Sequence, residues 1–365
     1  MKKLTYLLAV AAVFAACNNG NKGYTVTGTI EGATDGDTVF LQTVEGRQLV
    51  KLDSAVITNG TFTFKGTQDT AANRYITYSP AGAEGMIMDF FLENGKINIK
   101  LDGKGNSATG TENNDIYQAI RVQLNDLDTQ MENIYTSMSD TALTGQQREA
   151  KGKEMEALEN KMVEVAKAAI NQNITNAVGV HLLKNNFYYL DVEELDPLMP
   201  QIPGLYSNDA TIIRIKDNVE RMKATAVGEK FTDFEMQTPE GETVRLSDYA
   251  GKGKTVLVDF WASWCGPCRR EMPNLVEAYA KYKNKNFEIV GVSLDQNGDS
   301  WKEAIKKLNI TWPQMSDLKY WNCEGAQLYA VSSIPHTVLI DGEGTIIARG
   351  LHGDELQEKL AEVIK

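Results

Sequence analysis

The chain divides into three zones by the spacing of its hydrophobic positions. In the first zone apolar and polar residues alternate in several short segments, among them Tyr24 to Ile30, Thr38 to Leu41, Thr61 to Phe64 and Lys96 to Leu101. A period of two is typical of half-buried β-strands. Asn59 and Gly60 tolerate positive φ and lie between two apolar segments, so they predict a two-residue hairpin turn. We therefore expect residues 24–111 to form a small antiparallel β-sandwich.

The second zone, residues 112–225, has the period of an α-helix. Apolar residues recur every three or four positions in two stripes, which are Ile116, Ile120, Leu124, Leu127, Met131, Ile134 and Met138, and then Met155, Leu158, Met162, Val165 and Ala169. Turn-forming residues between the stripes predict an antiparallel helical hairpin. We favour packing within the chain over a dimerising coiled coil, because neither helix holds four clean heptads. Three prolines near residue 200 interrupt helix, and one further helix is expected over Asn208 to Lys223.

The third zone, residues 226–365, has the pattern of an α/β domain. The segment from Lys254 to Phe260 holds a continuous apolar run with one acid, Asp259, which predicts a buried central strand. A helix-forming stretch from Arg269 to Lys283 follows it. Further strands are expected on both sides of Pro239-Glu240-Gly241, over Phe287 to Asp295, and on both sides of Gly342-Glu343-Gly344. Helices are expected near residues 300–308 and 354–364. The zone holds all five tryptophans and three of the four cysteines, which marks it as a separate domain.

Composition narrows the classes of protein to consider. With 365 residues, 42% hydrophobic and 24% charged, the chain is long and apolar enough for two or three folded domains. Its net charge of -12 repels phosphate backbones, so nucleic acid is not an expected partner. Four cysteines are too few for a disulfide-stapled scaffold. Cysteine is therefore expected to serve chemistry.

The first 23 residues indicate export. Two lysines precede an apolar run from Leu4 to Ala16, which is too short to span a bilayer and is typical of a signal peptide, residues 1–16. Val13 to Cys17 resembles a bacterial lipobox, although Phe14 replaces its usual small aliphatic residue. The resemblance implies a lipid on Cys17 and a polar tether over residues 17–23; the alternative is an ordinary secretory signal. We expect a lipid-anchored, periplasm-facing protein on the inner or outer membrane of a Gram-negative bacterium.

The third zone carries a dithiol where the predicted buried strand meets the helix, in the sequence Cys265-Gly266-Pro267-Cys268. A helix amino end offers free N–H groups and a partial positive charge, which favour a thiolate on Cys265. With two residues between them, both sulfurs can reach one disulfide. Cys265 would stay exposed and attack a substrate disulfide, and Cys268, turned inward, would resolve the mixed disulfide.

A zinc site is the alternative reading of such a cysteine pair, and it needs further ligands. Cys323 and three scattered histidines do not supply them, so we expect no metal and no cofactor beyond the redox-active pair. Cys323 itself is interpreted as a partly buried bystander, with a regulatory disulfide as the alternative. His181 stands alone on an apolar segment and is interpreted as a packed histidine.

The segment from Val256 to Cys268 resembles the active site of thioredoxins, including Trp264, Gly266 and Pro267. The surrounding domain resembles the exported TlpA/ResA-like thiol-disulfide oxidoreductases, which carry an AhpC/TSA-like thioredoxin domain. This resemblance implies a thioredoxin-like fold. It also implies a proton-accepting role for Asp259 when the mixed disulfide resolves, and a carboxyl in an apolar strand should have a raised pKa.

Two prolines extend the resemblance to thioredoxins. Pro273 lies where the active-site helix of the family bends, and Ser333-Ile334-Pro335 is similar to its cis-proline loop. The resemblance implies that Pro335 is cis, faces Cys265 and holds the substrate backbone. Peroxiredoxins share this longer outline, with a proline and a threonine or serine a few residues before their reactive cysteine. Val258 to Trp264 contains no proline or threonine at the corresponding places, so peroxidase activity is not expected. Residues 24–225 are matched only loosely, by exported thioredoxin-like lipoproteins that carry a β-rich module of unassigned function.

These features together predict a membrane-tethered periplasmic enzyme that reduces disulfides of exported proteins and receives electrons from a membrane donor. The reducing direction follows from the resemblance of Gly266-Pro267 and Asp259 to reducing thioredoxins. An oxidase or isomerase is the alternative among enzymes. A lipoprotein that uses its thioredoxin domain only to dock a partner is the alternative outside them.

Overall fold

A computed structural model describes residues 23–364 except 81, 83, 104 and 141. The expected signal peptide and Cys17 lie outside the described residues. The chain forms two compact units, divided between Leu183 and Lys184. The domain boundaries expected after residues 111 and 225 stay predictions. Within the described ranges, no helix is both long and apolar enough to cross a membrane.

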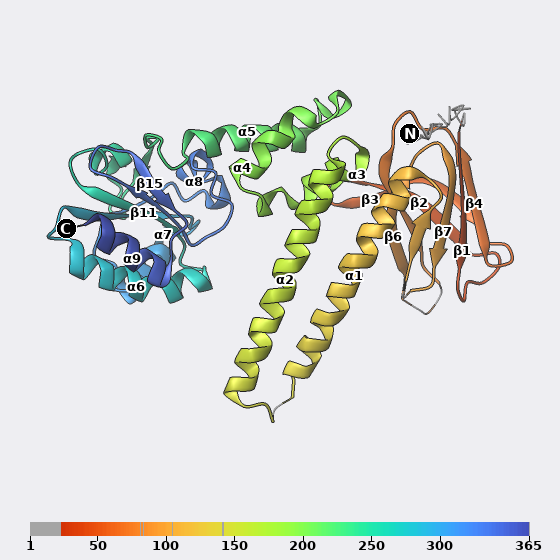
Figure 1. The fold of residues 1–365 in the computed structure, drawn as a ribbon, viewed down its shortest axis with the longest axis horizontal. Helices are drawn as coiled ribbons and strands as arrows, with labels where there is room; N and C mark the ends of the chain where they lie inside the picture. Colours follow the sequence, from red (N-terminus) through yellow and green to blue (C-terminus); the bar gives the residue numbers. More distant parts are fainter. Residues whose placement is uncertain (1–22, 81, 83, 104, 141, 365) are drawn as a thin grey trace, which may run out of the picture. The chain divides into compact units, whose positions relative to one another are not determined.

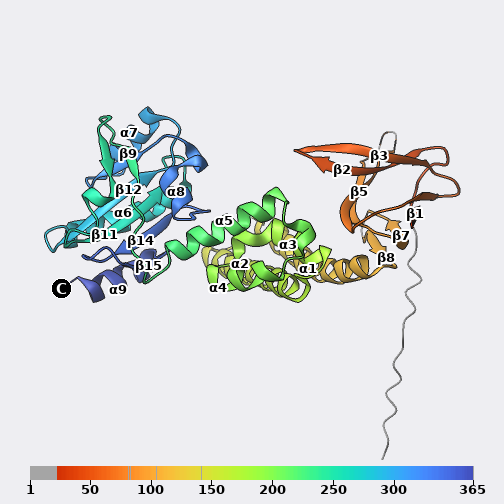
Figure 2. The same cartoon turned by 90° about the horizontal axis from the view of Figure 1, so that it is seen from above.

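The first unit begins with a sandwich of two four-stranded sheets, which Figure 2 shows as two layers. One sheet has the order β4 (Thr61–Gly66), β1 (Tyr24–Ile30), β7 (Gly95–Leu101) and β8 (Ser107–Thr109). The other has the order β3 (Gln48–Val56), β2 (Thr38–Glu45), β5 (Ala72–Tyr78) and β6 (Met86–Leu92). The inward residues of both sheets form one hydrophobic core, because alternate side chains of a strand point to the same face.

Two details of the sandwich differ from the expectation. β1 pairs in parallel with β7, so that sheet is mixed and not wholly antiparallel. The turn at Asn59-Gly60 forms, with φ of 51° and 66°. It closes a minimal hairpin, because Thr58 and Thr61 pair as an isolated antiparallel bridge with N···O distances of 2.9 and 3.1 Å. The pairing does not extend into a ladder, because β3 and β4 belong to different sheets. The turn itself was therefore predicted correctly from Asn59 and Gly60. The pairing of the strands depends instead on which face of each strand is buried in the core.

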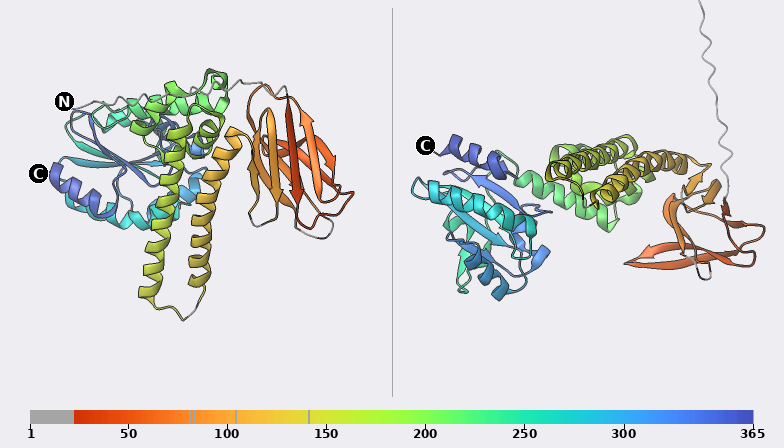
Figure 3. Two further views of the ribbon diagram at one scale, coloured as in Figure 1. Left: turned by 45° about the vertical axis from the view of Figure 1, so that its right-hand side comes forward. Right: turned by 90° about the horizontal axis from the view of Figure 1, so that it is seen from below.

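A helical hairpin follows the sandwich within the first unit. The helices α1 (Glu112–Met138) and α2 (Gly145–Asn173) run side by side in antiparallel directions (Figures 1 and 3), and α3 (Ala177–Asn186) follows. The apolar stripe of α1 is buried or half-buried along its length, which confirms the expected seam. His181 packs edge-on against Phe91 and Tyr117, with ring centroids 5.6 and 5.7 Å apart.

The second unit opens with short helical elements and then a longer helix. These are the 3₁₀ helix η1 (Phe187–Tyr189), α4 (Val192–Leu195), η2 (Asp196–Gln201), η3 (Gly204–Tyr206) and α5 (Ala210–Ala224). Pro197 and Pro200 lie in η2, where the missing proline N–H groups limit regular helix. The expected helix near Asn208 to Lys223 is present as α5.

The rest of the second unit is a thioredoxin-like α/β domain around a seven-stranded sheet. The sheet has the order β10 (Thr243–Arg245), β9 (Glu235–Gln237), β13 (Gln314–Ser316), β12 (Phe287–Ser293), β11 (Thr255–Trp261), β14 (His336–Ile340) and β15 (Ile346–Arg349). The helices of the domain are α6 (Gly266–Tyr282), α7 (Gly298–Lys307), α8 (Glu324–Leu328) and α9 (Gly353–Val363). α6 and α9 lie together on one face of the sheet (Figure 1). β11 lies inside the sheet and is buried, and α6 begins soon after β11 ends. The dithiol therefore lies beyond the carboxyl end of β11.

Candidate active site

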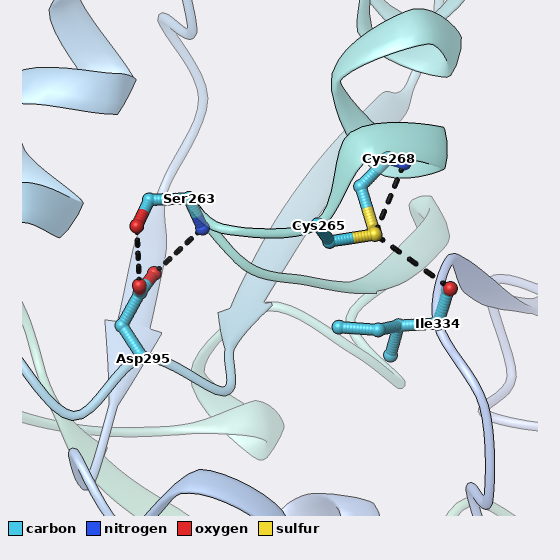
Figure 4. Close-up of a disulfide and its surroundings, with 5 residues drawn as sticks. All are labelled: Ser263, Cys265, Cys268, Asp295 and Ile334. Carbon is cyan, nitrogen blue, oxygen red and sulfur yellow. Dashed lines mark hydrogen bonds between the residues drawn. A yellow bond between two sulfur atoms is a disulfide. The ribbon is translucent and has the colours of Figure 1, made fainter.

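Cys265 and Cys268 form a disulfide at the amino end of α6 (Figure 4). Cys265 is the N-cap residue, and its Sγ accepts a hydrogen bond of 3.1 Å from the backbone N–H of Cys268. Gly266 and Pro267 are the first residues of the helix, where proline loses no intrahelical bond. The same N–H that meets the sulfur in the disulfide would stabilise a thiolate on Cys265 after reduction.

The expectation that Cys265 is exposed was wrong for this oxidised state. Its side chain is only 4% exposed, and that of Cys268 is 1% exposed. The loop before β14 covers the disulfide: the carbonyl oxygen of Ile334 lies 3.6 Å from Cys265 Sγ (Figure 4). The Ile334–Pro335 peptide bond is cis, as the resemblance implied. The structure therefore brings Pro335 and Cys265 together, although they are 70 positions apart in the chain.

Asp259 lies on β11, seven to nine positions before the first turn of α6, and its side chain is 1% exposed. Its Oδ2 has no hydrogen-bond partner. Burial, with a smaller contribution from the negative charge of Glu271, raises the pKa of Asp259 from 3.8 to about 7. A carboxyl with such a pKa can accept and release a proton near neutral pH. Glu271 was not singled out from the sequence, since a single glutamate in a helix carries no local signal.

A second carboxylate orders the loop that precedes the dithiol. Asp295, which follows β12 and is 1% exposed, accepts hydrogen bonds from the Ser263 hydroxyl at 2.5 Å and from the Ser263 backbone N–H at 3.0 Å (Figure 4). The Ser293 hydroxyl donates a further bond of 2.8 Å to Asp295. These bonds fix the backbone two residues before Cys265. The spacing of 32 residues between Ser263 and Asp295 gives no sequence signal for this contact.

Aromatic side chains surround the exposed edge of the site. Trp264 is 46% exposed, and its ring lies 5.1 Å from that of Tyr320 and 6.4 Å from that of Trp321. We call Trp264, Tyr320 and Trp321 the aromatic cluster. Leu318 and Tyr320 have φ of 55° and 57°, a backbone conformation that is strained for bulky residues and is often found at functional sites. The sequence analysis named only Trp264 of this cluster.

Cys323 is a free, fully buried thiol. Burial raises its pKa to about 12, so it stays protonated and unreactive at neutral pH. This environment agrees with the interpretation of Cys323 as a bystander, and it is more deeply buried than expected. Pro273 lies inside α6, on the helix that carries the dithiol.

Two family models match separate parts of the chain, one over the β-sandwich and one over the α/β domain. Residues 227–349 match the AhpC/TSA family, and residues 24–117 match a domain of unknown function, DUF4369. The thiol-disulfide oxidoreductase ResA of Bacillus thuringiensis subsp. konkukian is 33% identical over 139 residues, which are 38% of this chain and 77% of that protein. The ResA of Oceanobacillus iheyensis is 38% identical over 141 residues, 38% of this chain and 69% of that protein.

Solved structures from Bacteroides species are similar to part of the chain. A thiol-disulfide oxidoreductase from Bacteroides fragilis is 34% identical, with 37% of this chain and 100% of that chain covered and a TM-score of 0.36. The thioredoxin domain of a thiol-disulfide oxidoreductase from Bacteroides vulgatus is 36% identical, with 38% and 99% covered and a TM-score of 0.36.

Proposed function

This chain belongs to the ResA-type thiol-disulfide oxidoreductases, and we propose that it reduces disulfides of exported proteins while tethered to a membrane in the periplasm. One observation carries the proposal: the Cys265–Cys268 disulfide caps α6 beneath the cis-proline loop. The pair itself is the redox group, with no further cofactor proposed. The reducing direction is supported by the Gly266-Pro267 spacer and by a buried Asp259 with a pKa near neutrality.

The proposed exchange has two steps. First, the Cys265 thiolate attacks one sulfur of the client disulfide; a Cys265–client bond forms, and the other client sulfur leaves as a thiolate that takes a proton from water. Second, Cys268 gives its proton to the Asp259 carboxylate and attacks Cys265 Sγ, which breaks the mixed disulfide. The second client sulfur leaves as a thiolate and takes a proton from water. Two electrons pass to the client, and the enzyme ends in the disulfide form seen here.

Return to the dithiol form requires two electrons from another dithiol. Outside the cytosol no glutathione pool supplies them, so we propose a membrane protein with a reactive dithiol as the donor. The polypeptide nature of the client is supported by the aromatic cluster, in which Trp264 and Tyr320 are exposed and can pack against apolar side chains. A lipid on Cys17 would keep enzyme and donor on one membrane.

The exchange is tested by trapping the mixed disulfide. In Cys268→Ser, Cys265 can still attack a client disulfide, but no second thiol is present to break the mixed disulfide. Clients should therefore accumulate as adducts on Cys265. Cys265→Ser is the matched control and should carry none. Mass spectrometry of the purified Cys268→Ser protein identifies the adducts. If neither variant holds adducts, and binding to partners survives both substitutions, the thioredoxin domain serves docking and the proposal is wrong.

The direction is tested by the reduction potential of the pair in a Cys323→Ser background, which leaves a single redox couple in the folded chain. Trp264 fluorescence in glutathione or dithiothreitol buffers reports the state of the disulfide. A value near about -270 mV, that of thioredoxin, is expected for a reductase. A value near about -120 mV would make the protein an oxidase. Location is tested separately, since Cys17→Ser should move the protein from the membrane fraction to the soluble periplasm.

A further inference from the structure

A pocket of about 500 Å³ opens in the second unit beside the cis-proline loop. Residues 188–193 line it, together with Met222 of α5 and Ala226 and Val227, which follow that helix. The thioredoxin-like domain contributes further lining residues, among them Ser333, His336 and Arg349. Ser333 directly precedes Ile334, whose carbonyl oxygen lies 3.6 Å from Cys265 Sγ. The pocket thus shares a loop with the active site without containing a residue of the proposed exchange.

Arg349 places a positive charge in this pocket without a carboxylate to neutralise it. Its Nη1 donates bonds of 2.7 Å to the carbonyl and hydroxyl oxygens of Thr225, and its Nη2 donates to the carbonyl of Tyr329 at 2.5 Å. Among the described residues, Arg349 forms no ion pair with Asp or Glu. Burial lowers the pKa of Arg349, although arginine stays charged in proteins. A partly buried cation held only by neutral groups is favourable to an incoming anion.

His336 adds to the same electrostatic environment. Its Nε2 lies 3.4 Å from Nη2 of Arg349. Burial first, and then the charge of Arg349, lower the pKa of His336 to about 3, so the imidazole is neutral at pH 7. An anion beside both groups would offset the positive charge of Arg349 and so raise the pKa of His336.

The walls of the pocket are mainly apolar, with Leu190, Met222, Ala226 and Val227 lining it. Asp191 and Glu193 line it as well, but both side chains are exposed, where water screens their charge. These two carboxylates disfavour a ligand with several negative charges. The ligand that fits this pocket therefore has one negative charge and an apolar body.

We propose that this pocket binds a carboxylate carried on an apolar body, with the carboxylate against Arg349 and His336. Two sources share that chemistry: a free small carboxylic acid, and a carboxyl-terminal or acidic residue of the client polypeptide. The binding itself does not depend on disulfide exchange, so it can be tested on the oxidised protein.

The test uses three probes with the same hexyl body, titrated into the purified oxidised protein by calorimetry at pH 7. Hexanoate is expected to bind with a dissociation constant of about 1 mM or tighter. Hexanol and hexylammonium, which lack the negative charge, should bind at least about tenfold more weakly, because a hydrogen bond to a charged group is worth more than one to a neutral group. Equal binding of hexanol and hexanoate would overturn the proposal, and so would no binding of hexanoate.

Two variants locate the binding. Both variants keep the bonds from Arg349 to Thr225, which hold the guanidinium in place. Ala226→Trp fills the pocket without touching these bonds, and it should lower hexanoate affinity at least about tenfold. Ala361→Trp, at an exposed position of α9, is the matched control and should bind as the parent does. Unchanged hexanoate affinity in Ala226→Trp would place the binding elsewhere and overturn the proposal.

The imidazole of His336 gives a readout that apolar binding alone would not move. Hexanoate should raise the pKa of His336 in a nuclear magnetic resonance titration, and His336→Gln identifies the signal. Hexanol should leave that pKa unchanged. Hexanoate binding without a rise in the pKa of His336 would contradict contact with this residue.

The source of the carboxylate is distinguished by turnover of a disulfide peptide with a free or an amidated carboxyl terminus. If the client supplies the carboxylate, hexanoate should raise KM for the peptide with the free carboxyl terminus and leave KM for the amidated peptide unchanged. If a small acid is the natural ligand, hexanoate should change neither KM. This arm rests on the proposed exchange. Failure of both peptides to turn over would count against that exchange and would leave the calorimetric result standing.

Discussion

At the scale of single residues, Asp259 is the clearest case of a group whose position costs stability. A carboxyl with an ordinary pKa near 3.8 is held in an apolar strand with one oxygen unpartnered, and its pKa rises to about 7. The unfolded chain releases this proton near pH 4, while the folded chain keeps it until about pH 7. Proton binding therefore favours the folded state, and the free energy of unfolding falls as the pH rises between these values.

We predict that Asp259→Asn stabilises the oxidised protein, and more so at pH 9 than at pH 5. Asparagine cannot ionise, so the variant escapes a penalty that approaches about 4 kcal/mol above pH 7. Denaturant unfolding at the two pH values measures the difference. Glu358→Gln, at an exposed position of α9, is the control and should unfold like the parent. A gain for Asp259→Asn that is equal at both pH values would contradict the raised pKa.

Single residues also show where sequence reasoning succeeds and where it stops. Cys265, Cys268 and Asp259 lie within ten positions of one another, so a local pattern contains them all. Asp295, Tyr320 and Arg349 reach their partners only through the fold, and each is an ordinary residue in its own segment. The exposure of Cys265 was predicted wrongly for the same reason, because the covering loop comes from residues near 334.

At the scale of elements, the alternating segments predicted β1, β2, β4 and β7 well, and the uninterrupted apolar segments predicted β11 and β12. β5 and β6 were not predicted, because Ala72–Tyr78 mixes polar residues on both faces and Met86–Leu92 shows no clean alternation. Strand order was also beyond reach. Nothing local states that β1 should pair in parallel with β7, since that pairing depends on closing one core between two sheets.

The loop between β13 and α8 is an element with a predicted role in client selection. It presents Tyr320 and Trp321 beside Trp264, so Trp321→Ala should raise KM for a polypeptide disulfide by about tenfold, the typical effect of losing one aromatic contact at an interface. Turnover of a small disulfide such as oxidised dithiothreitol should not change. Tyr135→Ala, in the first unit and 75% exposed, is the control. An equal loss on both substrates would indicate damage to the dithiol.

At the scale of the whole molecule, each unit has its own hydrophobic core. One core runs from Val26 to Ala108 and the other from Phe234 to Ile364, and neither contains a residue of the other unit. A fragment beginning at Lys184 should therefore fold alone and form the Cys265–Cys268 disulfide. Calorimetry checks this expectation, since the fragment should unfold within a few degrees of one transition of the full chain.

A shorter fragment beginning at residue 226 tests the boundary expected from the sequence. It removes Thr225, whose carbonyl and hydroxyl oxygens accept from Arg349. Losing partners of a partly buried charge costs on the order of 1–3 kcal/mol, so this fragment should unfold several degrees below the longer one. Equal stability of the two fragments would place the boundary after residue 225.

In α2, the second helix of the hairpin, the buried side chains lie far from the tip of the hairpin. The buried residues of α2 are Ala166, Ala169 and Ile170, which all lie in its last eight residues. The capping box of Thr144 and two bonds from Arg148 to the carbonyls of Met138 and Asp140 hold the tip together. Amide protons near the tip should therefore exchange with deuterated solvent by local fraying, long before those of the buried turns, which must wait for a larger opening of the unit.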